Sequence, residues 1–354
     1  MDNKTITITK DDLATAIRAL LPAYNVYAPA GEGERLAFAA LDESRLGAIN
    51  LTGSPVIPPK ELLFPRSESL YTLDPETGAA TVPEIAESTL IFGVRPCDLR
   101  GIENLDAAFL EKGYVDSNYA KRRENTTIIA LACVTSPYET CFCESMGGDP
   151  LAAKGADVLL TETKAGDAFT AAFQTPKGLQ VKLLWDSLAM DCGSAPAMTE
   201  GSKPAMTEGS KPAMTGQHNT LRVTKPDDLP QRLMAAFDDP HWAVLSEACL
   251  GCGTCSYVCP TCYCFDIDRE SGAKEITEYR CWDCCMFSDY SRMAGGHNPR
   301  PTKKERLRNR YLHKLAYFDE RYGMTLCVGC GRCIAKCPAS LDITEVIEWG
   351  GGAL

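Results

Sequence analysis

Short apolar runs and amphipathic stretches alternate along the first 190 residues of the chain. Leu13, Ile17 and Leu20 recur at helical spacing, so the pattern predicts a helix over about 10–21, with Thr9 as its N-cap. A second helix is expected over about 98–111. Apolar runs predict strands at 26–28, 36–41, 90–94, 127–132, 156–161 and 168–174. Residues 1–190 are therefore predicted to form a mixed α/β domain.

Beyond residue 190 the pattern changes twice. Residues 191–240 are interpreted as a linker, because Pro-Ala-Met-Thr-Glu-Gly-Ser-Lys occurs at 196–203 and again at 204–211. This low-complexity repeat is too rich in Pro, Gly and Ser to build a core, and only a short helix is expected near 229–237. From 241 to 354 the pattern indicates helices and tight loops. The predicted fold class is α+β, with the mixed α/β domain followed by a mainly helical C-terminal domain.

The composition is that of an ordinary globular protein, with 45% hydrophobic and 23% charged residues among 354. The net charge of −11 lies in the first two thirds, since residues 241–354 hold 14 basic and 14 acidic side chains. This balance argues against a general nucleic-acid or anionic-membrane binder. No apolar run approaches the roughly 18 residues that span a bilayer, and the N-terminus lacks the features of a signal peptide. We expect a cytoplasmic protein without a membrane span.

Cysteine is the outlier in this composition. The chain has 18 cysteines, and all except Cys192 lie in two groups, at 97–143 and 249–337. A reducing compartment disfavours structural disulfides, so clustered cysteines there indicate metal ligands or redox groups. Cys192 borders the repeat and is interpreted as a bystander.

Two stretches have the cysteine spacing of bacterial ferredoxins. Cys249-x-x-Cys252-x-x-Cys255-x-x-x-Cys259-Pro260 is repeated as Cys327-x-x-Cys330-x-x-Cys333-x-x-x-Cys337-Pro338. Three thiolates on one tight loop reach three irons of a [4Fe–4S] cubane, and in two-cluster ferredoxins the fourth cysteine of each motif ligates the other cluster. The predicted ligands of the first cluster are Cys249, Cys252, Cys255 and Cys337. The predicted ligands of the second cluster are Cys327, Cys330, Cys333 and Cys259.

The N-terminal domain contains a third group of cysteines. Cys97 and Cys133 each follow a predicted strand, and Cys141 and Cys143 come shortly afterwards. If the two strands are adjacent and parallel, both thiols emerge at the carboxyl edge of the sheet, where open α/β sheets place their ligands. These four residues are the predicted ligands of a third [4Fe–4S] cluster. Zinc, or no metal at all, is the alternative.

Five further cysteines lie between the two ferredoxin motifs, at Cys262, Cys264, Cys281, Cys284 and Cys285. Four of them could hold another metal. They could equally pack as small apolar residues around the clusters, since free cysteine is often buried. The sequence leaves both interpretations open.

A basic run follows these cysteines, with Arg300, Lys303, Lys304, Arg306, Arg308, Arg310 and Lys314. A solvated helix face explains such a run, and so do cations that flank anionic clusters or dock an acidic partner. Nucleic-acid binding is disfavoured, because no array of stacking aromatic residues accompanies the charges.

Signatures of other chemistry are missing from the sequence. There is no Gly-x-Gly-x-x-Gly after a predicted strand, no Walker loop and no His-Glu-x-x-His pattern. We therefore predict no catalytic residue and no cofactor besides clusters.

Several stretches together resemble one protein family. They are Gly93-Val-Arg-Pro-Cys-Asp-Leu, Thr140-Cys-Phe-Cys-Glu-Ser-Met-Gly-Gly, Cys259-Pro-Thr-Cys-Tyr-Cys-Phe-Asp, Cys281-Trp-Asp-Cys and Ala294-Gly-Gly-His-Asn-Pro-Arg-Pro through Arg310-Tyr-Leu-His-Lys. The chain resembles the beta subunits of cytoplasmic sulfhydrogenase-type NiFe hydrogenases and the dicluster iron–sulfur subunit of anaerobic sulfite reductase. The likeness covers nearly the whole chain, and the repeat departs from it.

The resemblance implies an electron-transfer subunit with no substrate chemistry of its own. Such a subunit passes electrons between a flavin- and NAD(P)-binding partner of ferredoxin-reductase type and a terminal catalytic subunit. The terminal subunit would be a hydrogenase, a sulfite reductase or a heterodisulfide-reductase-like module. The alternative is a flavin-dependent reductase with its own substrate site in the N-terminal domain. A saturated cluster has no free coordination position, which favours the relay.

Overall fold

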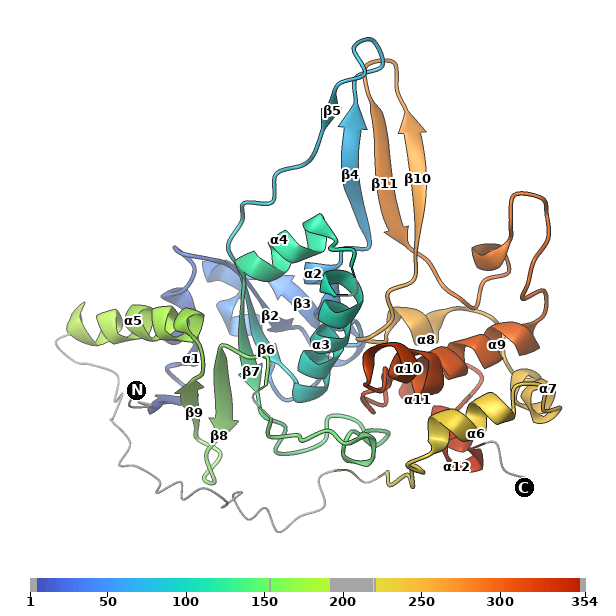
Figure 1. Ribbon diagram of the computed structural model, residues 1–354. Helices are drawn as coiled ribbons and strands as arrows, with labels where there is room; N and C mark the ends of the chain where they lie inside the picture. The colour runs from blue at the N-terminus through green and yellow to red at the C-terminus, as the bar shows by residue number, and fades with distance from the viewer. Residues whose placement is uncertain (1–4, 112, 153, 192–218, 220, 351–354) are drawn as a thin grey trace.

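The computed structural model describes residues 5–111, 113–152, 154–191, 219 and 221–350 (Figure 1). The repeat predicted at 196–211 and Cys192 lie outside the described residues. The described part of the chain forms two sheets and a series of mostly short helices.

The larger sheet has seven strands in the order β1-β9-β8-β7-β6-β2-β3. Strands β2, β6, β7 and β8 are parallel to one another. The other three strands are antiparallel to their partners: β3 pairs with β2, β9 with β8, and β1 with β9. The strand bounds are β1 (Thr5–Thr9), β2 (Asn25–Ala30), β3 (Ala37–Ala40), β6 (Thr89–Val94), β7 (Thr126–Leu131), β8 (Val158–Glu162) and β9 (Ala168–Phe173).

Alternating side chains of this sheet pack into two separate hydrophobic cores. Leu90 and Phe92 of β6 lie in one core, whereas Ile91 and Val94 lie in the other. Gly93, at φ +79°, shifts the register of β6 against β7, so Val94 joins the side of Ile91. The first core includes residues of α1 (Leu13–Arg18) and α5 (Pro176–Asp191). The second includes residues of α2 (Lys60–Leu63), α3 (Pro96–Leu110) and α4 (Ser117–Asn125).

The predicted strands of this sheet are all present, with ends within two residues of the prediction. The helix predicted over 98–111 is α3. The helix predicted over 10–21 is shorter, because the chain remains in β1 as far as Thr9 and then turns. Thr9 Oγ1 accepts the N–H of Asp12 at 3.1 Å within that turn, so it caps the turn and not the helix. Strand β1 and helices α4 and α5 were not predicted.

The smaller sheet projects from the rest of the molecule and joins distant parts of the chain (Figure 1). Its order is β10-β11-β4-β5, and every pair is antiparallel. The strands are β4 (Ser67–Leu73), β5 (Ala80–Thr81), β10 (Phe265–Ser271) and β11 (Ile276–Trp282). The β10–β11 hairpin lies between the two ferredoxin motifs, where the sequence indicated only helices and loops. Its pairing with β4 connects residues on both sides of the predicted domain boundary.

Short helices make up the remainder of the C-terminal part, which confirms the predicted α+β class. They are α6 (Leu229–Ala235), α7 (His241–Ser246), α8 (Thr254–Tyr257), α9 (Lys303–Leu312), a π-helical turn (His313–Tyr317), α10 (Phe318–Tyr322), α11 (Arg332–Ala335) and α12 (Ile343–Trp349). Short 3-10 turns occur at Gly33–Arg35, Glu43–Ala48, Glu144–Met146 and Asp289–Ser291. Trp242, Tyr311 and Trp349 meet in the core between these helices, with the two tryptophan rings 5.1 Å apart.

Among the described residues, no helix combines the length and the apolar character needed to cross a membrane.

Candidate iron–sulfur sites

The four cysteines predicted for the first cluster line one pocket: Cys249, Cys252, Cys255 and Cys337. Backbone amides point at two of these sulfurs. The N–H of Gly251 donates to Cys249 Sγ at 3.4 Å, and the N–H of Leu341 donates to Cys337 Sγ at 3.2 Å. Hydrogen bonds of this kind stabilise the anionic thiolates of an iron–sulfur cluster. Cys252 is the exposed member of the set.

The four cysteines predicted for the second cluster line another pocket: Cys259, Cys327, Cys330 and Cys333. The buried ammonium of Lys314 lies in the same pocket and donates to Cys259 Sγ at 3.2 Å. A hydrogen bond with Cys262, together with the cations Lys314 and Arg310, holds the pKa of Cys259 well below its usual range. The environment of Cys259 therefore favours the thiolate.

The two ferredoxin motifs have the same local geometry. In each motif a glycine with positive φ precedes a four-residue helix, Gly253 before α8 and Gly331 before α11. The left-handed conformation, at φ 78° and 74°, favours glycine because it carries no Cβ. A further pocket, lined by Cys249, Cys255, Cys333 and Cys337, lies between the two motifs. The two cysteine sets are thus neighbours.

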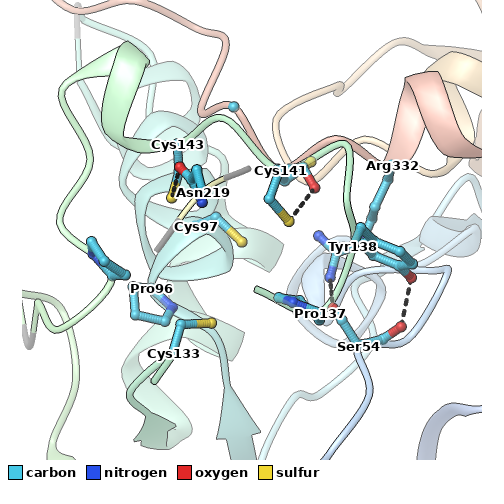
Figure 2. A pocket seen from close by; sticks show the side chains of 13 residues that line it. Ser54, Pro96, Cys97, Cys133, Pro137, Tyr138, Cys141, Cys143, Asn219 and Arg332 are labelled. Atoms are coloured by element: carbon cyan, nitrogen blue, oxygen red, sulfur yellow. Dashed lines mark hydrogen bonds between the residues drawn. The ribbon is translucent and has the colours of Figure 1, made fainter. Parts of the chain in front are cut away.

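The four N-terminal cysteines come together as well. Strands β6 and β7 are adjacent and parallel, which meets the condition stated for this site, so Cys97 and Cys133 emerge at one edge of the sheet. Cys141 and Cys143 approach from the loop that follows. All four line one pocket, and Figure 2 shows their side chains around a common space.

The chemistry of this N-terminal pocket fits a thiolate-bound metal centre. Burial raises the pKa of Cys143 to about 11, and the neighbouring Cys141 and Cys133 contribute to the shift. Bare thiols here stay protonated at neutral pH, and metal binding would displace their protons. Arg95 offers positive charge, with its Nη1 atom 3.8 Å from Cys133 Sγ. The four sulfurs are the soft ligands that iron–sulfur clusters require.

The N-terminal pocket is continuous with the second ferredoxin motif. Gly329, Cys330 and Arg332 line it together with the N-terminal cysteines. The N–H of Phe142 donates to the carbonyl of Gly329 at 2.9 Å, and Cys141 Sγ lies 3.6 Å from the carbonyl oxygen of Cys330. A Cβ at Gly329 would lie 2.6 Å from backbone atoms of this loop, so only glycine allows the approach.

The other five cysteines lie at or within the β10–β11 hairpin. Cys262, Cys264, Cys284 and Cys285 lie at its base, where all except Cys264 are buried. Cys281 lies within β11. Among the described residues, no group of three or more His, Cys, Asp or Glu side chains is arranged to hold a single metal ion. Each thiolate of a cubane binds a different iron, so this finding does not bear on the clusters.

Three residues of the basic run do not belong to a solvated helix face. Arg306, Arg310 and Lys314 are buried, and the last two point at cysteines and the loops that carry them. Lys60 is a third cation of this region and donates to the carbonyl of Cys262 at 2.7 Å. Sequence reasoning missed Lys60, because it lies about 200 residues from the motif that it contacts.

The fold and the paired cysteine motifs define a dicluster iron–sulfur protein. The 4Fe-4S dicluster domain family matches residues 248–341, which contain both ferredoxin motifs. The chain is 32% identical over 294 residues to sulfhydrogenase 2 subunit beta of Pyrococcus furiosus, with 83% of this chain and 82% of that relative covered. The chain belongs to the family of sulfhydrogenase beta subunits, which confirms the resemblance seen in the sequence. No solved structure matches the chain.

Proposed function

We propose that this chain is the iron–sulfur electron-transfer subunit of a hydrogenase-type or related multi-subunit oxidoreductase. It relays electrons between a terminal subunit and a reductase subunit that binds flavin and NAD(P). The terminal subunit is a hydrogenase, a sulfite reductase or a heterodisulfide-reductase-like module. The relative supports this role within a complex, since its name identifies it as the beta subunit of a sulfhydrogenase.

Three [4Fe–4S] clusters carry the electrons in this proposal. The first two are held by the ferredoxin-motif cysteines in the exchanged sets described above, and the third by Cys97, Cys133, Cys141 and Cys143. Bound clusters supply one-electron redox chemistry. The protein supplies buried pockets that limit water access, amide hydrogen bonds to sulfur, and positive charge.

The single observation that carries the proposal is the continuity of the three pockets. The N-terminal pocket and the second-motif pocket share Gly329 and Cys330 as lining residues. The pocket between the motifs then joins Cys333 to Cys249 and Cys337. A series of adjoining cysteine pockets suits a relay, since electrons pass between neighbouring clusters without a mobile carrier.

The test uses the anaerobically purified complex of the chain with its partner subunits. Cys252→Ala and Cys141→Ala each remove a ligand at opposite ends of the series, and Cys281→Ser is the matched control. We expect both Ala variants to lose electron flow from the nicotinamide cofactor to the terminal subunit. The reductase subunit and the terminal subunit should each still react with an artificial redox dye, because both of these subunits are unchanged. The Cys281→Ser complex should retain its full rate.

Full nicotinamide-linked turnover in the Cys252→Ala complex would refute the relay. A flavin bound in the N-terminal pocket of the isolated chain would instead favour a reductase with its own substrate site. The absorbance and fluorescence of flavin released by acid from the purified chain report this outcome directly.

A further inference from the structure

Lys314 connects the two chain segments that supply the second cluster set. Its Nζ atom donates to Cys259 Sγ at 3.2 Å, and its carbonyl oxygen accepts the N–H of Leu326 at 3.1 Å, directly before Cys327. Cys259 belongs to the first ferredoxin motif and Cys327 to the second. Lys314 therefore contacts both the exchanged ligand and the start of the loop that carries the other three.

The backbone at Lys314 is irregular. Helix α9 ends at Leu312, the π-helical turn His313–Tyr317 contains Lys314, and the chain returns to an α-helix in α10. Turns of this kind are rare and occur frequently at functional sites. The irregular turn is an observation independent of the side-chain contact, and it points to the same residue.

The ammonium of Lys314 is buried and its partners are not carboxylates. The residue is 3% exposed, and its Nζ atom also donates to Thr261 Oγ1 at 3.0 Å. A buried cation is costly unless negative charge balances it. Its thiol partner Cys259 is the group placed to balance this charge, and a thiolate at hydrogen-bond distance in turn favours the protonated amine.

The other buried cations near the ferredoxin motifs do not act on the second set in this way. The guanidinium of Arg332 is balanced by the carboxylate of Asp98. Arg310 lines the pocket between the motifs, so its charge acts on both sets. Of the cysteine pockets described above, Lys314 lines only that of the second set. Lys314 is therefore the cation that distinguishes the second site from the first.

We propose that Lys314 sets the reduction potential of the second [4Fe–4S] cluster by holding a positive charge against Cys259. A cubane with four thiolates is anionic, and its negative charge grows when it takes up an electron. A cation in a buried pocket of low dielectric constant stabilises the reduced form more than the oxidised form, and so raises the potential. This inference rests on the proposed second cluster and names the residue that tunes it.

The second site is the middle of the proposed relay. Its pocket shares Gly329 and Cys330 with the N-terminal pocket, and the pocket between the motifs joins it to the first set. Stabilising the reduced form at this position favours electron uptake from one neighbour and slows release to the other. Lys314 would thus make the middle cluster the place where an electron is held between two transfers.

The experiment measures the potential of each cluster in the full-length chain, purified without oxygen. Dithionite titrations are followed by electron paramagnetic resonance. Lys314→Met removes the charge and keeps an unbranched side chain. Lys303→Met is the matched control, because Lys303 donates to the carbonyl of Cys249 at 2.8 Å but is exposed to water. We expect Lys314→Met to lower one potential, that of the signal missing from Cys327→Ala, and the control to change none.

A second variant separates the charge of Lys314 from its hydrogen bond. Lys314→Gln is neutral but keeps a donor, so we expect it to lower the same potential. Unchanged potentials in Lys314→Met overturn the proposal. Wild-type potentials in Lys314→Gln would assign the effect to the hydrogen bond and overturn it as well. Loss of the second-cluster signal from both neutral variants would make Lys314 an assembly residue, which also overturns the tuning role.

The inference and the proposed function can fail separately. The relay is judged by turnover of the whole complex in cysteine variants, whereas the potentials are measured on the chain without its partners. If Cys327→Ala still shows every cluster signal, the second cluster assignment fails and this inference with it. Unchanged potentials in Lys314→Met refute the inference alone.

Discussion

Arg332 of the second ferredoxin motif forms a bidentate ion pair with Asp98 of helix α3, with contacts of 2.5 and 2.9 Å. Both side chains are 1% exposed. The guanidinium also donates to Ser54 Oγ and to the carbonyl of Pro55. Asp98 follows Cys97 and Arg332 precedes Cys333, so the pair fixes the N-terminal cysteine site against the second ferredoxin site.

Loss of one partner of this pair should destabilise the protein strongly. Asp98→Asn removes the charge that compensates Arg332 and should lower the free energy of unfolding by about 3–5 kcal/mol. Glu34→Gln is the control, because Glu34 is 92% exposed and pairs at 3.4 Å with Lys336. That change should cost less than about 1 kcal/mol. Anaerobic denaturant titrations of both variants measure the difference, and equal midpoints would contradict the structural role of Asp98.

Equivalent glycines of the two ferredoxin motifs should respond differently to the same substitution. Gly251 and Gly329 both have positive φ, at 69° and 67°. An added Cβ at Gly251 would find its nearest neighbour at 3.8 Å, whereas at Gly329 it would lie 2.6 Å from backbone atoms of the Phe142–Cys143 loop. Gly251→Ala should therefore cost only the backbone strain, about 1–2 kcal/mol. Gly329→Ala should also displace the loop.

The readout for this pair is iron content after anaerobic purification. Gly329→Ala should lose iron from the N-terminal and second-motif sites, while Gly251→Ala retains it. Comparable iron in the two variants would show that the contact between Gly329 and the Cys141–Cys143 loop does not hold the sites together.

The sequence predicted what is local and left out what depends on distant contacts. The apolar run at 90–94 predicted β6 correctly, because a strand buried on both faces is apolar throughout. The cysteine spacing predicted which thiols share a pocket, since three of each set lie on one loop. The hairpin was missed because β10 is mostly polar and exposed, and because its partner β11 pairs with β4, about 200 residues away.

The burial of these cations could not be predicted from the local sequence, for a similar reason. Helix α9 contains so many charges that its sequence suggests a solvated face, yet Arg310 is 3% exposed. Only the cysteine-bearing loops that surround Arg310 in space explain its burial, and they come from another part of the chain.

Arg280 of β11 should be the main anchor of the projecting sheet. It is 3% exposed at its side chain and pairs with Glu68 of β4 and with Asp116. Its guanidinium also lies 5.0 Å from the ring centre of Phe64. Arg280→Met leaves Asp116 without its cation and Glu68 with Arg122 alone, and should lower the free energy of unfolding by about 3 kcal/mol.

Arg269 on the same hairpin provides the control for Arg280. It pairs with Glu278 at 2.9 Å, but its side chain is 55% exposed. Arg269→Met should therefore cost less than about 1 kcal/mol. Limited proteolysis of the hairpin in both variants should show faster cleavage only for Arg280→Met. Cleavage at the wild-type rate in that variant would mean that other contacts hold the sheet.

His313 should make stability depend on pH below neutrality. Burial and the neighbouring Lys314 lower the pKa of His313 to about 4, and its Nε2 atom lies 3.2 Å from the hydroxyl oxygen of Tyr263. The unfolded chain takes up this proton near its ordinary pKa of about 6.5, whereas the folded chain does not until about 4. More protons are then bound in the unfolded state, so stability falls as the pH falls through this window, by up to about 3 kcal/mol.

His313→Gln should remove this part of the pH dependence. The measurement is the anaerobic thermal midpoint from about pH 7.5 to about pH 5.5, roughly one unit on either side of the ordinary histidine pKa. Wild-type protein should lose stability more steeply toward the acid end than His313→Gln, by about 1 kcal/mol. His297→Gln, at an exposed position, is the matched control. Parallel curves for wild type and His313→Gln would mean that His313 takes up its proton over the same pH range in the folded and the unfolded protein.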